Sequence, residues 1–278
     1  PPRSTQGVSS AASDVYKRQN QSTLEEPQDP LTEVSLDQLP GSLRTAVGHP
    51  GWSELMPVQA RAIPYLLAGR DMVIQARTGS GKTAAFLLPM LERLDSAASH
   101  TQALVLVPTR ELARQVQRDA EMLWQGNEFR TVAVYGGVGY GPQVDALKAG
   151  AHLVVATPGR ALDHLLRGTL SLKHLTLVVF DEADRMLSMG FYPDMKEMQS
   201  YLPERQIHTC MFSATFPASV MRTAREFIEQ PELLTLSRDH VHVTDTEHIA
   251  YVVPPMEKDR ALITVSYTHL TLPTILLV

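Results

Sequence analysis

The sequence predicts an α/β fold with a mostly parallel central sheet and helices on both faces. Between residues 36 and 237, short apolar runs rich in β-branched residues alternate with segments of helical periodicity. Near-continuous apolar runs are typical of strands covered on both faces, and their alternation with helices favours βαβ units. Polar or glycine-rich segments follow the runs, and open α/β sheets bind ligands beyond the carboxyl ends of their strands. We therefore expect one continuous site along that edge.

The apolar runs define the expected strands, which are 72–74, 104–107, 132–134, 153–155, 177–180 and 210–212. Between them, segments 110–124 and 217–228 each carry an apolar stripe at helical spacing, which indicates amphipathic helices. Pro217 stands near the start of the second segment, where a proline costs no amide partner.

The composition limits the classes of function. With 278 residues and 44% hydrophobic content, the chain can bury a large core. Its formal net charge of −5 argues against a broadly basic surface, so any contact with nucleic acid should be local. Composition alone favours a protein that binds no nucleic acid. Cys210 is the one cysteine, and with His208 it does not make a zinc site. We find no membrane-spanning apolar run and no secretory leader, and expect a cytoplasmic monomer without membrane contact.

Residues 76–83 read Ala-Arg-Thr-Gly-Ser-Gly-Lys-Thr, which is the pattern of a phosphate-binding loop. The segment follows an expected strand and opens a helix, although its first position is Ala76 and not glycine. Glycines let the backbone wrap a phosphate, and the helix N-terminus adds partial positive charge. The alternative is a plain Gly-Ser turn before a helix. The expected nucleotide-binding residues are Thr78, Gly79, Ser80, Gly81, Lys82 and Thr83, with Lys82 reaching the β/γ phosphates and Thr83 ligating Mg²⁺.

Residues 181–184 place an acidic cluster directly after the apolar run 177–180. A carboxylate at that position can hold Mg²⁺ beside a bound nucleotide, which we expect of Asp181 together with Thr83. The adjacent Glu182 can orient and deprotonate an attacking water. An acidic cluster is often only a solvated turn. In a chain with a phosphate-binding loop, we expect Glu182, Lys82 and Asp181 to be catalytic.

The acidic cluster reads Asp-Glu-Ala-Asp, and the chain here resembles the DEAD-box ATP-dependent RNA helicases. Six segments match the family's motifs in order: 76–83, 108–113, 136–137, 157–160, 181–184 and 213–215. The resemblance covers roughly residues 36–262. It implies a RecA-like P-loop NTPase fold, ATP and Mg²⁺ as cofactors, and ATP-driven local unwinding of RNA.

Residues 51–59 resemble the family's Q motif, in which a glutamine reads adenine through its amide, here Gln59. Trp52 stands where phenylalanine is usual, and we favour a core aromatic over a ligand contact for it. The family also places an aromatic upstream to stack on adenine. The nearest counterpart in this chain is Leu36.

The resemblance also implies a set of RNA contacts through phosphate and ribose, with little sequence specificity. These residues are Thr109, Arg110, Gly137, Thr157, Gly159 and Arg160. For the two arginines, surface charge at a helix start is the alternative. In the family, Ser213 and Thr215 couple nucleotide and RNA binding, and we expect one of them to contact Asp184.

The family implies a second RecA-like domain, which supplies arginines to the ATPase site and the other half of the RNA clamp. No Gly-rich, Arg-rich motif of that type follows residue 215, and 247–262 resembles the linker toward that domain. We expect a chain that binds ATP weakly, hydrolyses it very slowly and does not unwind duplexes alone.

Both ends of the chain look foreign. Segments 9–19 and 265–275 resemble translated sequencing-adapter read-through, with a natural tail and a natural final strand as the alternatives. The expected divisions are a disordered tail over 1–30, the RecA-like ATP-binding domain over 31–240, a linker and start of a second domain over 241–263, and a foreign tail over 264–278.

Two other functions remain open at the level of sequence. One is a nucleotide-gated RNA clamp or scaffold with little turnover. The other is a DNA helicase or a different P-loop ATPase, against which the Gln59 segment argues, because most P-loop ATPases lack one.

Overall fold

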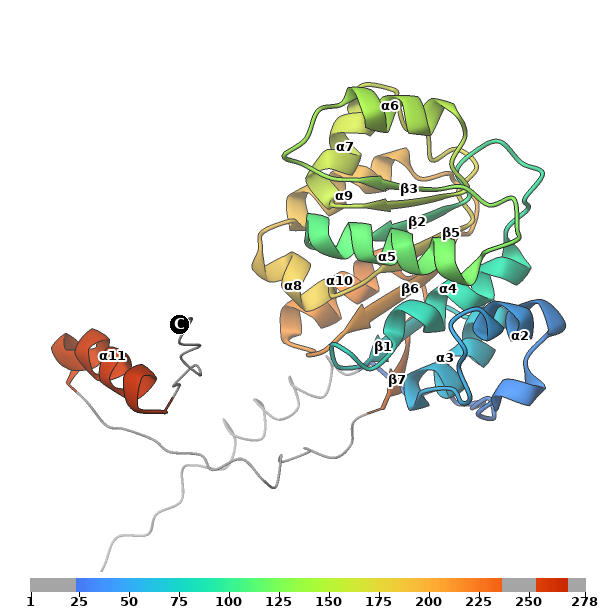
Figure 1. Ribbon diagram of the computed structural model, residues 1–278. Helices are drawn as coiled ribbons and strands as arrows, with labels where there is room; N and C mark the ends of the chain where they lie inside the picture. The colour runs from blue at the N-terminus through green and yellow to red at the C-terminus, as the bar shows by residue number, and fades with distance from the viewer. Residues whose placement is uncertain (1–23, 237–253, 270–278) are drawn as a thin grey trace, which may run out of the picture. The chain divides into compact units, whose positions relative to one another are not determined.

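The computed structural model describes residues 24–236 and 254–269. The chain divides into two compact units, Pro1–Arg238 and Asp239–Val278. The first contains a seven-stranded sheet in the order β3-β4-β2-β5-β6-β1-β7, and every neighbouring pair is parallel. The predicted α/β class with a parallel central sheet is confirmed (Figure 1).

The six apolar runs of the sequence are all strands. Their bounds are β1 (Met72–Gln75), β2 (Ala103–Leu106), β3 (Thr131–Val134), β4 (Leu153–Ala156), β5 (Leu177–Phe180) and β6 (His208–Ser213). The seventh strand, β7 (Glu232–Thr235), was not predicted. It lies at the sheet edge beside β1, and three of its four residues are only partly buried. A short, half-covered edge strand leaves no continuous apolar run in the sequence.

Helices cover both faces of the sheet (Figure 1). One face packs against α2 (Gly41–Gly48), α3 (Pro57–Leu67), α4 (Lys82–Arg93) and α5 (Arg110–Leu123). The other packs against α7 (Pro158–Leu166), α8 (Ala183–Ser188), α9 (Tyr192–Met198) and α10 (Ala218–Phe227). Three further elements complete this unit: α6 (Gly141–Lys148), next to β3, and the 3₁₀ turns η1 (Leu36–Gln38) and η2 (Gln199–Tyr201).

Alternating strand residues separate the two cores. In β1, Met72 and Ile74 point into the core beneath α3 and α4, while Val73 between them points into the other core. All three are fully buried. Because side chains alternate across a strand, an uninterrupted apolar run is needed to cover both faces. Phe86 of α4 meets Phe212 of β6 edge to face, with ring centroids 5.4 Å apart.

The described fold begins before the boundary expected at residue 31. Leu24 is buried, and the Glu25 carbonyl accepts a hydrogen bond from the Leu233 amide at 2.8 Å. Arg70 donates to the Asp29 carbonyl at 2.7 Å. Residues 24–30, part of the expected disordered tail, therefore lie against the sheet, while residues 1–23 lie outside the described residues.

In the second unit, the described residues form η3 (Pro255–Glu257) and α11 (Lys258–His269). Residues 264–269, part of the expected foreign tail, are thus helical and do not form a strand. The rest of the expected linker and tail lies outside the described residues. No helix within the described part of the chain is long and apolar enough to cross a bilayer.

His208 is a buried imidazole at the amino-terminal end of β6. Its Nε2 lies 2.7 Å from the Arg70 carbonyl, and its Nδ1 has no hydrogen-bond partner among the described residues. Burial lowers the pKa of His208 from 6.5 to about 4. The folded protein therefore holds this ring neutral at a pH where the unfolded chain protonates it.

We predict that His208 makes the protein less stable as the pH falls from 6.5 towards 4. In that window the unfolded chain binds a proton that the folded chain excludes, so the free energy of unfolding falls by up to about 3 kcal/mol. Urea unfolding at a series of pH values should show a smaller loss for His208→Gln than for the unsubstituted chain. Equal losses in the two proteins would contradict the assignment.

Candidate active site and nucleic-acid interface

The sheet order sorts the sequence motifs into two neighbouring groups. Strands β1, β6 and β5 are adjacent, and their carboxyl ends lead into 76–83, 213–215 and 181–184. Strands β2, β4 and β3 are also adjacent, and they lead into 109–110 and the segments that contain Thr157 and Gly137. The nucleotide motifs thus share one half of the sheet edge, and the expected RNA contacts share the other.

The phosphate-binding loop joins β1 to α4 and is tied to β6. The Ala76 amide donates to the Ser213 carbonyl at 3.0 Å. Gly79 and Gly81 adopt φ angles of 79° and 87°, which favour glycine. A Cβ atom on Gly81 would lie 2.5 Å from Met56 Sδ and 2.7 Å from the Gln59 carboxamide nitrogen. The Q-motif segment therefore packs closely on the loop, and a side chain at position 81 would have to displace the ends of the Met56 and Gln59 side chains.

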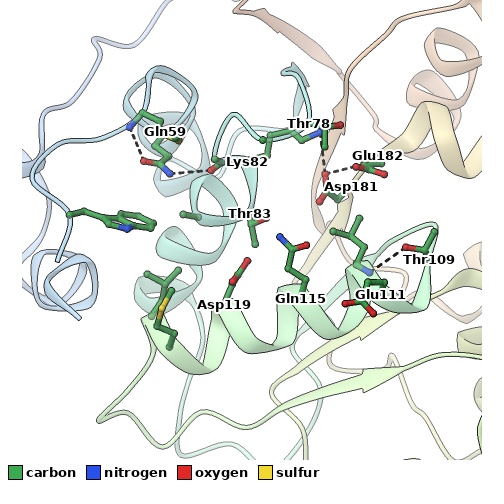
Figure 2. A pocket seen from close by; sticks show the side chains of 18 of the residues that line it. Gln59, Thr78, Lys82, Thr83, Thr109, Glu111, Gln115, Asp119, Asp181 and Glu182 are labelled. Atoms are coloured by element: carbon green, nitrogen blue, oxygen red, sulfur yellow. Dashed lines mark hydrogen bonds and ion pairs between the residues drawn. The ribbon is translucent and has the colours of Figure 1, made fainter. Parts of the chain in front are cut away.

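Lys82 and Asp181 form a buried pair between this loop and the end of β5 (Figure 2). Lys82 Nζ lies 3.8 Å from Asp181 Oδ1, and it has no hydrogen-bond partner among the described residues. Both side chains are almost completely buried. Burial raises the pKa of Asp181 to about 6, against the opposing effect of the Lys82 charge. A buried ammonium without an acceptor is costly, and an anionic oxygen beside it would remove that cost.

Glu182 has an unusual backbone. Among the described residues it is the one non-glycine residue with a positive φ, at 54°. This left-handed conformation at the start of α8 costs a non-glycine residue about 1–3 kcal/mol, and such residues cluster at functional sites. Its amide donates to Asp181 Oδ1 at 3.0 Å, and its carboxylate pairs with Arg185 at 3.2 Å.

Asp184 links the acidic segment to the segment after β6, and the expected contact is present. Thr215 donates to Asp184 Oδ2 through its hydroxyl at 2.7 Å and its amide at 3.0 Å. The Asp184 amide donates to Ser213 Oγ at 3.2 Å. Burial alone would raise the pKa of Asp184, but hydrogen bonding with Thr215 and Ser213 holds it below its ordinary value. The charged carboxylate thus joins two neighbouring strand ends.

A cleft of about 900 Å³ brings these groups together with the Q-motif segment. Gln59 lines it, with its carboxamide accepting from the Met56 amide at 2.9 Å and donating to the Gly81 carbonyl at 3.2 Å (Figure 2). Trp52 packs against the core, as expected, and also lines the cleft. Leu36 also packs against the core, but it is not among the described residues that line the cleft.

Helix α5 supplies a wall of the cleft that sequence reasoning missed. Glu111, Gln115 and Asp119 lie along this wall (Figure 2). Burial raises the pKa of Asp119, although the side chain faces a cleft. The signal is present in the sequence, because the helix is strongly amphipathic and these three side chains lie outside its apolar stripe.

The expected RNA-binding residues differ in their exposure and in the protein groups to which they are already hydrogen-bonded. Arg110 and Gly137 are exposed, and a Cβ on Gly137 would lie 3.5 Å from the Arg110 guanidinium. Thr109 caps α5 by accepting from the Leu112 amide at 3.3 Å. Thr157 and Gly159 begin α7 and are half-buried. Arg160 is already bound to protein groups, since two of its nitrogens each donate to the Val138 carbonyl at 3.1 Å.

Comparison with known proteins identifies the family. The family model described as DEAD/DEAH box helicase matches residues 56–223 of this chain. The chain belongs to the DEAD/DEAH box helicase family.

Individual relatives agree with this family. The chain is 42% identical over 226 residues to the ATP-dependent RNA helicase DeaD of Haemophilus influenzae, covering 81% of this chain and 37% of the relative. It is 40% identical over 221 residues to the DEAD-box ATP-dependent RNA helicase CshA of Bacillus licheniformis, covering 80% and 45%. The chain thus spans less than half the length of these curated relatives.

Among solved structures, the fold is similar to that of a DEAD box protein from the hyperthermophile Methanococcus jannaschii. The TM-score is 0.71 at 33% sequence identity, and the match covers 84% of this chain and 64% of that one. Together with the family match, this confirms the expected RecA-like class of the family.

We predict that the two left-handed glycines of the phosphate loop differ in their tolerance of alanine. Nothing lies within 4 Å of a Cβ on Gly79, so Gly79→Ala should cost only the backbone term of about 1–2 kcal/mol. Gly81→Ala must also push aside the ends of the Met56 and Gln59 side chains and disturb the Gln59–Gly81 hydrogen bond, so its loss of unfolding free energy should be larger by about 1 kcal/mol. Urea unfolding measures both, and equal losses would contradict the close packing.

Proposed function

We propose that this chain is the nucleotide-binding half of an ATP-dependent RNA helicase core. It binds ATP with Mg²⁺ and the RNA sugar-phosphate backbone, and it hydrolyses ATP and locally unwinds RNA once a second RecA-like domain is present. The observation that carries the proposal is the buried Lys82 ammonium, which lies at the phosphate loop without a hydrogen-bond acceptor among the described residues. A phosphate oxygen is the acceptor that this arrangement fits best.

The residues around Lys82 fit a nucleotide and its magnesium ion. Segment 78–83 leads into the N-terminus of α4, where free backbone amides and the helix dipole favour anions, and nothing crowds the backbone at Gly79. Thr83 and Asp181 would hold Mg²⁺, since a hydroxyl and a carboxylate are oxygen ligands that the ion prefers. The bound ion supplies neutralisation of phosphate charge. Gln59 would read adenine by exchanging its present bonds to Met56 and Gly81 for bonds to the base.

Glu182 is the proposed general base, and the folded chain already fixes its backbone conformation without a nucleotide. Its backbone is held in a costly conformation, which places the carboxylate in the cleft beside Asp181. Arg185 balances the negative charge of the carboxylate. A carboxylate so held can accept a proton from a water molecule and return it to solvent.

The activity of this chain alone should be low. The family implies arginines from a second domain, and an arginine finger contributes about 10³–10⁵ in rate in related phosphoryl-transfer enzymes. This chain alone should therefore bind the nucleotide weakly and turn it over very slowly. Clear RNA-stimulated ATP hydrolysis by this chain alone would contradict that expectation.

We predict that Mg²⁺ and ATP stabilise the chain and that Lys82→Met abolishes this effect. A ligand that binds the folded state stabilises it by RT ln(1 + [L]/Kd), so the unfolding midpoint should rise with ATP concentration. Removing the ammonium removes the main phosphate contact. Lys173→Met, at an exposed position outside the cleft, is the control and should respond like the unsubstituted chain. An equal rise for Lys82→Met would argue against the site.

A further prediction concerns Glu182→Gln in this chain joined to a second RecA-like domain. The substitution should reduce RNA-stimulated hydrolysis by about 10²–10⁴, because it removes a general base while keeping shape. ATP and RNA should remain bound. If hydrolysis is negligible before the substitution and RNA retention is unchanged after it, the scaffold function is favoured instead. Equal binding of DNA and RNA of one sequence would favour a DNA-acting enzyme.

A further inference from the structure

Arg160 makes an unusual set of contacts for a residue expected to meet RNA. Its guanidinium donates twice to the Val138 carbonyl, at 3.1 Å each, and once to Gln143 Oε1 at 3.4 Å. It lies over the Tyr140 ring at 4.1 Å from the centroid. The side chain is only 9% exposed. Its hydrogen-bonding capacity is therefore directed into the protein.

These three partners belong to one stretch of chain, whereas Asp163 of α7 also pairs with Arg160 Nε at 4.0 Å. Val138 and Tyr140 lie in the segment 135–140 between β3 and α6, which we call the 135–140 loop, and Gln143 lies in the first turns of α6. The two bonds to one carbonyl and the stacking on tyrosine use the planar shape of the guanidinium, which a lysine lacks. Arg160, in the first turn of α7, therefore holds this loop by hydrogen bonding and by stacking.

A buried glutamine ties down the base of the same loop. Gln143 is buried and donates to the Tyr135 carbonyl at 3.0 Å. Its Oε1 receives Arg160 and lies 3.1 Å from His164 Nε2. His164 is fully buried in α7. One connected set of polar groups on α6 and α7 therefore holds the loop at Tyr135 and at Val138, either side of the glycines.

Gly137 lies between these two anchored points. It is exposed, has a φ of 82°, and stands close to the exposed guanidinium of Arg110. A bare backbone amide beside an arginine is a good receptor for a phosphate, provided that its position is fixed in advance. Without the anchors, a glycine pair in a loop would sample many conformations.

We propose that Arg160 is a positioning residue, which fixes the 135–140 loop so that Gly137 and Arg110 together receive an RNA phosphate. It does not itself contact the RNA. The effect on RNA rests on the proposed function, whereas the hold on the loop stands on the contacts alone.

The first test measures backbone NMR order parameters in the chain without RNA. Arg160→Lys keeps the charge but loses the two hydrogen bonds to the Val138 carbonyl and the stacking on Tyr140. It should lower the order parameters of residues 136–139 from about 0.85, the value of rigid backbone, to below about 0.6, and leave α4 unchanged. Arg110→Lys is the matched control and should leave the loop as it is. Unchanged order parameters in the loop of Arg160→Lys would overturn the proposal, and unchanged values in α4 show that the variant folds.

The second test measures binding of a short oligouridine between about 50 and about 200 mM salt. Arg110→Lys keeps a phosphate contact and should bind nearly normally. Arg160→Lys should bind at least about tenfold more weakly, because its loop is released. Arg110→Gln should lower the salt slope by about 0.7, the value for one contact on a single strand, while Arg160→Gln should weaken binding with a smaller change of slope.

The outcomes separate the two levels of the proposal. If Arg160→Lys binds like the unsubstituted chain and Arg160→Gln loses a full phosphate contact in the salt slope, Arg160 touches RNA and the positioning role is wrong. If the unsubstituted chain fails to bind oligouridine, the proposed RNA function of this chain fails. The order parameters then still decide whether Arg160 holds the loop.

Discussion

The candidate site depends on a pair of opposite charges placed where water hardly reaches. Lys82 begins α4 and Asp181 directly follows β5, and each is buried to a degree that ionised groups accept only with a partner. Their separation of 3.8 Å offsets part of the desolvation cost, but it leaves Lys82 without a hydrogen bond to that partner. The loop and the acidic segment are thus brought together by a contact that is not fully satisfied, and a third, anionic group would complete it.

The parallel sheet makes this meeting possible. Because all strand pairs run in the same direction, every carboxyl end opens on one edge, and the order of strands decides which motifs become neighbours. The hydrogen bonds that Asp184 donates to Ser213 and accepts from Thr215 lie at the ends of β5 and β6. Strand β5 also borders β2, which leads to Thr109 and Arg110. Only the boundary between β5 and β2 therefore separates the acidic segment 181–184 from the half of the sheet edge that carries the expected RNA contacts.

The sequence allowed much of the sheet to be predicted, because strands buried on both faces need continuous apolar runs. The prediction from sequence missed strand β7 and the packing of residues 24–30. This edge strand and this extended segment depend on tertiary hydrogen bonds, such as that between Glu25 and Leu233. Motif residues came together as expected at Lys82 and Asp181. The behaviour of Arg160 could not be read from its motif, since its carbonyl and ring partners lie on another loop.

The two tryptophans stand in very different surroundings. Trp124 is buried at 3% exposure and donates through its indole nitrogen to the Leu87 carbonyl at 3.1 Å. Trp52 is half-buried on the wall of the cleft. A dissolved iodide ion can therefore collide with one indole far more readily than with the other. The chain carries its own optical probe of the cleft, with an internal reference in the core, and occupancy can be followed by fluorescence quenching without attaching a dye.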